Sequence, residues 1–230
     1  MTEGLWRIAL AGEGGQGVQV VGEVLAEAAY MDGKESIYIP NFGVEQRGGV
    51  SIAFVQISDR PIGSPKFAQA DILVPLSQRA IDRTKRYIHP QTLYIYECSA
   101  LEVPHLNEQA IGIQAWDTVA PEAFSLMVGH QPDQPGEPPS NTALRPGRTI
   151  GIPAAEIAKN ELQPRVFNII ILGAIIGASK VLSEEVVQQA IERKLGAKFK
   201  QDPKLRKMNM AAFQRGLQLA QEQLQEGAKS

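Results

Sequence analysis

A glycine-rich stretch near the start of the chain constrains the fold more than any other feature of the sequence. Residues 7–18 read R-I-A-L-A-G-E-G-G-Q-G-V, so an apolar run ends in the spacing G-x-G-x-x-G. Apolar residues then recur at helical spacing, at Val21, Val24, Leu25 and Ala28. The stretch therefore predicts a strand, a tight turn and a helix, with Gly33 as the residue that ends the helix.

Strand-like and helix-like segments continue to alternate over the first hundred residues. Runs that favour strands cover residues 36–39, 51–57, 72–76 and 92–96, and a helical pattern covers residues 78–88. The first two predicted strands and the helix between them form a βαβ unit, whose right-handed crossover leads to a parallel sheet. We therefore predict an α/β fold, a Rossmann-like and mostly parallel sheet flanked by helices on both faces.

The second half of the chain begins with a change of character. Six prolines fall between residues 116 and 148, and they exclude a continuous helix or a central strand there. This Pro-rich inserted loop is compatible with a binding arm and with an ordinary surface insertion. A short strand at 150–152 follows, and then helical patterns at 153–162, 165–179, 184–195 and 205–224. We predict one domain, residues 1–230, with an insertion at about 116–148 and a helical C-terminal region.

Two of the predicted C-terminal helices carry further signals. Ser183, followed by Glu184 and Glu185, has the pattern of an N-cap with acidic residues in the first turn. Gly173 and Gly177 stand four residues apart in the most apolar helix, where they permit close approach of another element. Packing within the chain and contact with another subunit explain these glycines equally well.

Charge and apolar segments limit the partners and the location that we expect. The apolar segment 166–178 is shorter than the roughly 20 residues that span a bilayer, and it contains Asn168, so we interpret it as a buried helix. The apolar run 8–11 is too short for a secretory signal, and we expect a cytoplasmic protein. A net charge of -2 gives no reason to expect nucleic acid, and the basic residues within 193–207 favour a solvated helical face.

Cysteine and histidine are too few and too scattered for a metal or redox centre. Cys98 is the only cysteine, so this chain alone forms no internal disulfide and supplies no four-thiolate iron-sulfur cluster. His89, His105 and His130 show no spacing typical of metal ligands. We expect no metal site and no Cys-His nucleophilic pair.

The G-x-G-x-x-G loop permits two interpretations. Glycines and the following helix N-terminus suit a phosphate group, but Glu13 places a carboxylate inside the turn, and no acid follows Ile39 to bind the ribose of a dinucleotide. Val18 stands where a Walker loop requires lysine. In the other interpretation the glycines let the turn pack tightly and let another molecule's backbone approach, with Gln16 as the long polar side chain at its rim.

A second unusual loop follows the second predicted strand. Residues 41–50 read N-F-G-V-E-Q-R-G-G-V, and we expect this loop beside the first, at the carboxyl ends of the strands. Arg47 could bind a phosphate or a carboxylate in bidentate fashion, or it could form an internal clamp with Glu45. The candidate binding residues of the two loops are Gly12, Gly14, Gly15, Gln16, Gly17, Asn41, Glu45, Arg47, Gly48 and Gly49.

The two loops together resemble those of a known family. G-E-G-G-Q-G-V at 12–18, P-N-F-G-V-E-Q-R-G-G at 40–49, S-D-R-P-I at 58–62 and A-D-I-L-V at 70–74 resemble the gamma subunit of 2-oxoacid:acceptor oxidoreductases. I-P-A-A-E-I-A at 152–158 and N-I-I-I-L-G-A at 168–174 are similar to its C-terminal half. The sequence departs from this family at Phe42, where tyrosine is more usual, and in the Pro-rich insertion.

The resemblance implies a role as one part of a larger enzyme. Such enzymes use thiamine diphosphate with Mg²⁺, iron-sulfur clusters and coenzyme A to decarboxylate a 2-oxo acid oxidatively to an acyl-CoA and CO₂. This chain has one cysteine, and its nearest match to the thiamine-binding G-D-G is Met31-Asp32-Gly33 at a helix end. We therefore expect no resident cofactor and no catalytic residue in this chain.

The resemblance also implies the partners. They are thiamine-binding alpha and beta type subunits, a ferredoxin-like delta type subunit and ferredoxin or another acceptor. Our hypothesis is that this chain completes the assembly and helps to receive coenzyme A. The alternatives are a stand-alone Rossmann-type NAD-binding oxidoreductase and a scaffold subunit without substrate contact.

Overall fold

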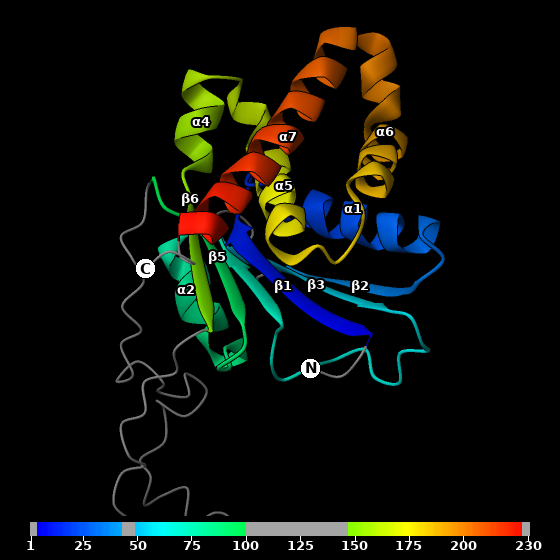
Figure 1. Cartoon of the computed structure of the whole chain (residues 1–230), viewed down its shortest axis with the longest axis vertical. Helices are drawn as coiled ribbons and strands as arrows, with labels where there is room; N and C mark the ends of the chain where they lie inside the picture. Colours follow the sequence, from blue (N-terminus) through cyan, green and yellow to red (C-terminus); the bar gives the residue numbers. More distant parts are fainter. Residues whose placement is uncertain (1–3, 43–48, 100–146, 227–230) are drawn as a thin grey trace, which may run out of the picture. The chain divides into compact units, whose positions relative to one another are not determined.

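Six strands form one sheet in the part of the chain that the structure describes, residues 4–42, 49–99 and 147–226 of a computed structural model. In sequence order the strands are β1 Leu5–Glu13, β2 Glu35–Asn41, β3 Val50–Ser58, β4 Ile72–Pro75, β5 Leu93–Glu97 and β6 Arg148–Ile152. Across the sheet their order is β2-β3-β1-β4-β5-β6 (Figure 1). All six predicted strands are present, with ends shifted by at most a residue or two.

Five of the strands run in the same direction, and β3 runs against them. Strands β1, β4, β5 and β6 pair in parallel, whereas β3 pairs antiparallel with both β1 and β2. The predicted mostly parallel α/β sheet is therefore confirmed, but β3 separates the two strands of the predicted βαβ unit. This insertion is possible because β3 follows β2 after only residues 42–49, and antiparallel neighbours need no crossover helix.

Helices cover both faces of the sheet. They are α1 Val18–Met31, α2 Gln78–Thr84, α4 Ala154–Asn160, α5 Phe167–Ser179, α6 Glu184–Gln201 and α7 Pro203–Glu226, with short 3-10 turns at Lys85–Tyr87 and Pro164–Val166. On β1, Ile8 and Leu10 belong to the main core beneath α1 and α5, whereas Ala11 packs with Ala80 of α2. Alternation along the strand thus places α2 on the face opposite α1 (Figure 1).

The predicted helices are confirmed with shifted ends. The segment predicted over 78–88 is α-helical only to Thr84, and the one predicted over 184–195 continues to Gln201. Ser183 caps α6 as predicted, because its Oγ accepts a hydrogen bond from the Val186 N–H at 3.3 Å. The predicted insertion lies outside the described residues except for Gly147 and Arg148, the latter being the first residue of β6.

The glycines of α5 serve packing within the chain. Gly173 and Gly177 face α7, and a methyl group on Gly173 would lie only 2.1 Å from the carbonyl oxygen of Phe213. On the opposing helix a methyl group on Gly216 would lie 2.0 Å from the carbonyl oxygen of Ile170. Of the two explanations for these glycines, contact between α5 and α7 accounts for the close approach.

Helix α5 lies inside the domain, as its apolar sequence predicts. All residues from Ile169 to Gly177 are buried. Within the described ranges, no helix combines the length and the hydropathy needed to cross a membrane.

Candidate functional site

The first glycine-rich loop and the two described ends of the second lie at one edge of the sheet, where β1 and β2 end and β3 begins. Glu13 at the end of β1 pairs with Val50, and Asn41 at the end of β2 pairs with Ile52. Gly49 therefore enters β3 beside the start of the first loop, as the sequence predicted. We call this the glycine edge, formed by the candidate residues Gly12, Gly14, Gly15, Gln16, Gly17, Asn41 and Gly49. The candidates Glu45, Arg47 and Gly48 lie outside the described residues.

The glycines of the first loop divide into two kinds. Gly12 is closely surrounded, since a methyl group there would lie 2.6 Å from Gln16 Oε1 and 2.8 Å from Val18 Cγ2. Gly14 and Gly15 are exposed, and a methyl group on either would meet nothing within 4 Å. The first position serves packing, and the next two leave an open backbone that another molecule can approach.

Gln16 turns inward and fastens the loop. Its Oε1 accepts a hydrogen bond from the Glu13 N–H at 2.6 Å, and its Nε2 donates to the Leu76 carbonyl oxygen at 3.0 Å. The side chain thus joins the ends of β1 and β4, the crevice where open α/β sheets bind ligands. The sequence placed this amide at the rim of the loop; in the structure it satisfies backbone groups of the loop and of β4 instead.

Gly17 begins α1 beside the start of α5. It has φ of +72°, and a methyl group on it would lie 2.7 Å from Nδ2 of Asn168, in the first turn of α5. Neither helix has a side-chain cap at its N-terminus. The start of α1 therefore presents free N–H groups at this edge, whereas the Phe167 N–H at the start of α5 donates to the Pro164 carbonyl oxygen. The positive dipole ends of both helices lie here, an arrangement that favours an anion. Sequence reasoning missed Asn168 here, although it is the one polar residue in its apolar run.

A hydrogen-bond network behind the edge joins α1 to two strands. Tyr38 OH donates to Gln19 Oε1 at 2.6 Å, and Gln19 Nε2 donates to Ser51 Oγ and to the Ile52 carbonyl oxygen at 3.3 Å. Burial, with a smaller contribution from Glu23, raises the pKa of Tyr38 above its ordinary value. The network holds β2 and β3 at fixed positions relative to the first loop. The sequence offered one signal for it, a second glutamine three residues after Gln16.

Phe42 adds an aromatic ring to the glycine edge. It directly follows Asn41 and is 68% exposed, and only Tyr30, at 70%, is a comparably exposed large hydrophobic residue in the described ranges. Exposed aromatic residues are typical of protein interfaces. The ring therefore gives this edge a large exposed apolar surface.

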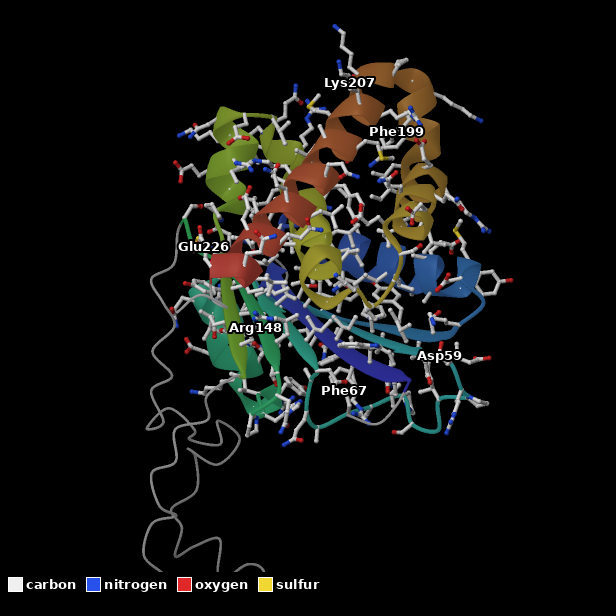
Figure 2. The ribbon with its side chains drawn as sticks, in the orientation of Figure 1. Asp59, Phe67, Arg148, Phe199, Lys207 and Glu226 are labelled. Atoms are coloured by element: carbon white, nitrogen blue, oxygen red, sulfur yellow. The ribbon has the colours of Figure 1, made fainter. Side chains whose placement is uncertain are left out.

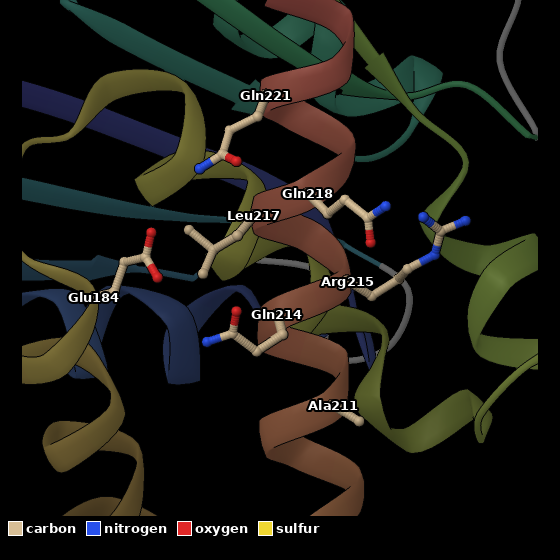
Figure 3. Close-up of a pocket in the computed structure, with 7 residues that line it drawn as sticks. All are labelled: Glu184, Ala211, Gln214, Arg215, Leu217, Gln218 and Gln221. Atoms are coloured by element: carbon tan, nitrogen blue, oxygen red, sulfur yellow. The ribbon is translucent and has the colours of Figure 1, made fainter.

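Two surface hollows lie away from the glycine edge. One of about 450 Å³ lies along α7 and the first residue of α6, and three of its seven lining residues are glutamines (Figure 3). Another of about 550 Å³ lies between α1, β2 and α6. Neither is lined by a residue of the two glycine loops.

The described residues do not fit a resident cofactor. Asp32 and Gly33 form the C-terminal end of α1, so the nearest match to the thiamine-binding tripeptide caps a helix. Burial raises the pKa of the Cys98 thiol, which disfavours the thiolate that a cluster would require. Across the described ranges no group of three or more His, Cys, Asp or Glu side chains is arranged to hold a metal ion.

The sheet order also argues against a bound dinucleotide. In dinucleotide-binding folds the second strand lies directly beside the first and ends in the acid that binds the ribose. Here β3 separates β2 from β1, so the end of β2 is displaced by about one further strand spacing, ~4.8 Å. That end carries Asn41 and not an acid.

The fold places the chain among α/β proteins with an open, mostly parallel sheet covered by helices on both faces. More narrowly, the chain belongs to the pyruvate ferredoxin/flavodoxin oxidoreductase family, which its residues 7–219 match. It is 30% identical over 218 residues to 2-oxoglutarate synthase subunit KorC of Methanocaldococcus jannaschii, covering 94% of each chain. The resemblance recognised in the sequence is thereby confirmed.

Solved structures show the same fold. The gamma subunit of a keto/oxoacid ferredoxin oxidoreductase from Geobacter sulfurreducens is 25% identical, with a TM-score of 0.62 over 94% of this chain and 98% of that chain. The 2-oxoglutarate:ferredoxin oxidoreductase from Magnetococcus marinus was solved with 2-oxoglutarate, coenzyme A and succinyl-CoA bound. It gives a TM-score of 0.70 at 22% identity, over 96% of this chain and 32% of that chain. This chain therefore spans about a third of the longer relative.

Proposed function

We propose that the chain is the gamma-type subunit of a multisubunit thiamine-diphosphate and iron-sulfur 2-oxoacid:acceptor oxidoreductase. The enzyme would convert a 2-oxo acid, coenzyme A and an oxidised acceptor to acyl-CoA, CO₂ and a reduced acceptor. The observation that carries this proposal is the end-to-end relation to a synthase subunit of nearly equal length. Because the residues that the structure describes do not fit the cofactors, the chain contributes surface and positioning, and the chemistry belongs to the other subunits.

Within that enzyme, the glycine edge helps to receive coenzyme A. Coenzyme A carries a pyrophosphate and a 3′-phosphate. The uncapped start of α1 offers N–H donors to such anions, and the positive dipole ends of α1 and α5 attract them. The exposed Gly14 and Gly15 let a phosphate approach the backbone closely. Arg47, in the second loop, would supply the positive charge.

The same edge also completes the assembly. Phe42 offers a large apolar surface, and the bare backbone of the first loop permits close contact with a partner chain. The expected partners are the thiamine-binding subunits and the ferredoxin-like subunit. Coenzyme A would then be received at a surface shared with a partner subunit.

Kinetics of the reconstituted enzyme test the role in coenzyme A binding. We expect Arg47→Ala and Gly14→Leu to raise the KM for coenzyme A about tenfold, the loss of roughly 1.4 kcal/mol of binding, with the KM for the 2-oxo acid unchanged. Gln221→Ala, an exposed position on α7, is the matched control. If both variants leave assembly, the KM for coenzyme A and turnover unchanged, the role in coenzyme A binding is wrong. The alternative of a scaffold subunit without substrate contact would then stand.

The isolated chain tests the dehydrogenase alternative. A free-standing NAD enzyme would turn over alone, and a saturating dinucleotide would raise its melting temperature. We expect neither result, whereas adding the other subunits should give a coenzyme A-dependent reaction. NAD-dependent stabilisation of the isolated chain would contradict the proposed function.

A further inference from the structure

The tip of the helical hairpin α6–α7 concentrates positive charge. Seven of the chain's 23 lysines and arginines fall within residues 193–207, and Asp202 is the one acid there. These residues form the end of α6, the turn and the start of α7, which Figure 1 shows on the side of the helices turned away from the sheet. The net charge of the whole chain is only -2, so this excess is local.

Three of the seven basic residues hold the hairpin in place. Each is paired with a glutamate: Arg193 with Glu27 at 2.9 Å, Lys194 with Glu23, and Arg206 with Glu192. The first two pairs fasten α6 to α1, and the third joins α7 to α6. Their charges are largely neutralised within the chain.

The other four basic residues have no such role. Lys198, Lys200, Lys204 and Lys207 are exposed, and none of them forms an ion pair with any described residue. The nearby Asp202 carboxylate accepts a hydrogen bond from the Lys204 N–H at 3.0 Å and so caps the start of α7. Figure 2 shows the Lys207 side chain extending outward from the tip.

The scaffold beneath these lysines is ordered by packing. Phe199 is buried between the helices at 6% exposure, and Asn209, at 7%, donates from Nδ2 to the Leu205 carbonyl oxygen at 2.7 Å. In Figure 2 the ring of Phe199 lies below the outermost turn that carries Lys207. The four charges are therefore presented at fixed backbone positions, which lowers the entropy lost when a partner binds.

We propose that the lysine tip, Lys198, Lys200, Lys204 and Lys207, docks on an acidic protein surface of another subunit of the same oxidoreductase. Lysines without an ion-pair partner at an exposed turn attract an acidic surface over a distance and so raise the association rate. They also suit the polar rim of a protein interface. Nucleic acid would require a longer basic face and exposed aromatic rings for stacking, and the tip offers neither. This inference rests on the proposed function, but its residues are separate from the glycine edge.

Reassembly of the enzyme tests the docking. The variant K198E/K200E/K204E/K207E and its glutamine counterpart are titrated with the remaining purified subunits between about 0.05 and 0.3 M NaCl. We expect the dissociation constant of the glutamate variant to be at least tenfold higher than that of the wild type at low salt, and to depend less on the salt concentration. The dissociation constant of the glutamine variant should lie between those of the wild type and the glutamate variant. The matched control R60Q/K66Q/K159Q/K180Q changes four exposed basic residues elsewhere and should bind as the wild type does. A wild-type dissociation constant and salt slope in the glutamate variant would overturn the proposal.

Carbodiimide cross-linking of the assembled enzyme gives an independent test, because it joins a lysine amine directly to a carboxylate in contact with it. We expect cross-links from the four lysines to Asp or Glu of another subunit, and cross-links only within this chain would overturn the proposal. A raised KM for coenzyme A with normal assembly, or loss of RNA binding alone, would also overturn it. If the wild-type chain itself fails to assemble, the proposed function fails, so the two failures are distinguishable.

Discussion

At the scale of single residues, Gln16 shows how one side chain fixes the candidate site. Its amide satisfies the Glu13 N–H and the Leu76 carbonyl oxygen at once. We expect Gln16→Leu to lower the free energy of unfolding by about 1–3 kcal/mol, because it leaves a donor and an acceptor unsatisfied in a partly buried loop. Urea denaturation measures the loss, and Gln221→Ala is the exposed control. An unchanged denaturation midpoint would mean that water replaces both hydrogen bonds at no cost.

Gly17 and Gly14 should respond differently to the same substitution. Gly17→Ala places an alanine in the left-handed region and its methyl group against Asn168. We therefore expect the free energy of unfolding to fall by about 1–3 kcal/mol. Gly14→Ala meets open space and should change stability by less than about 0.5 kcal/mol. In an Asn168→Ala background the cost at Gly17 should fall only by the part due to the amide group, because the remaining Cβ lies 2.9 Å from the new methyl group. A double-mutant cycle measures this difference. Equal costs in the two backgrounds would refute the contact with Asn168.

These residues also mark the limit of prediction from the sequence. The G-x-G-x-x-G spacing and its flanking segments predicted the turn, since close packing and positive φ both require glycine there. The inward turn of Gln16 and the approach of Asn168 were not predictable, because both depend on β4 and α5, elements remote in the sequence. The binding role of the loop residues stays a prediction.

At the scale of elements, the α5–α7 contact depends on glycine at the crossing. Gly173→Ala or Gly216→Ala would place a methyl group about 2 Å from a backbone carbonyl oxygen, and backbone cannot move aside as a flexible side chain can. We expect a loss of about 3 kcal/mol or more in chemical denaturation. Gly196→Ala on α6, where a methyl group meets nothing within 4 Å, should instead stabilise by about 0.5–1 kcal/mol. Similar effects at all three sites would contradict this account.

Element types were predictable from periodicity, but their neighbours were not. The alternation in residues 51–57 predicted a strand correctly, yet nothing local indicated that β3 would pair between β1 and β2. Pairing order depends on contacts among residues far apart in the sequence. This one insertion sets the distance between the ends of β1 and β2, and with it what the glycine edge can bind.

At the scale of the whole molecule, the charge distribution requires both sequence and structure. The sequence shows a basic segment at 193–207, and its interpretation as a solvated helical face agrees with the exposure of the four lysines. Only the structure separates these lysines from the three basic residues paired with glutamates. The family could be recognised from paired loop motifs, because both loops and their spacing had to agree.

The pH dependence of stability is a property of the whole domain. Burial is the first cause of a raised pKa in four groups, Tyr38, Tyr94, Tyr96 and Cys98. The folded state thus holds these protons more tightly than the unfolded chain, where the ordinary values are 10.0 for Tyr and 9.0 for Cys. Their contribution is fully present below those values and is lost as pH rises through the folded pKa values, so we expect the melting temperature to fall above about pH 9.

Tyr94 should account for a distinct share of this alkaline loss. It is 2% exposed, its OH has no hydrogen-bond partner in the described structure, and burial raises its pKa most strongly, with smaller contributions from Tyr96 and Asp82. Tyr94→Phe removes an unsatisfied hydroxyl, so at pH 7 it should be neutral or stabilising by about 1 kcal/mol. Above pH 10 its melting temperature should fall less steeply than that of the wild type, whereas Tyr30→Phe, at an exposed site, should leave the slope unchanged. Parallel curves for Tyr94→Phe and the wild type would show that Tyr94 does not couple ionisation to folding.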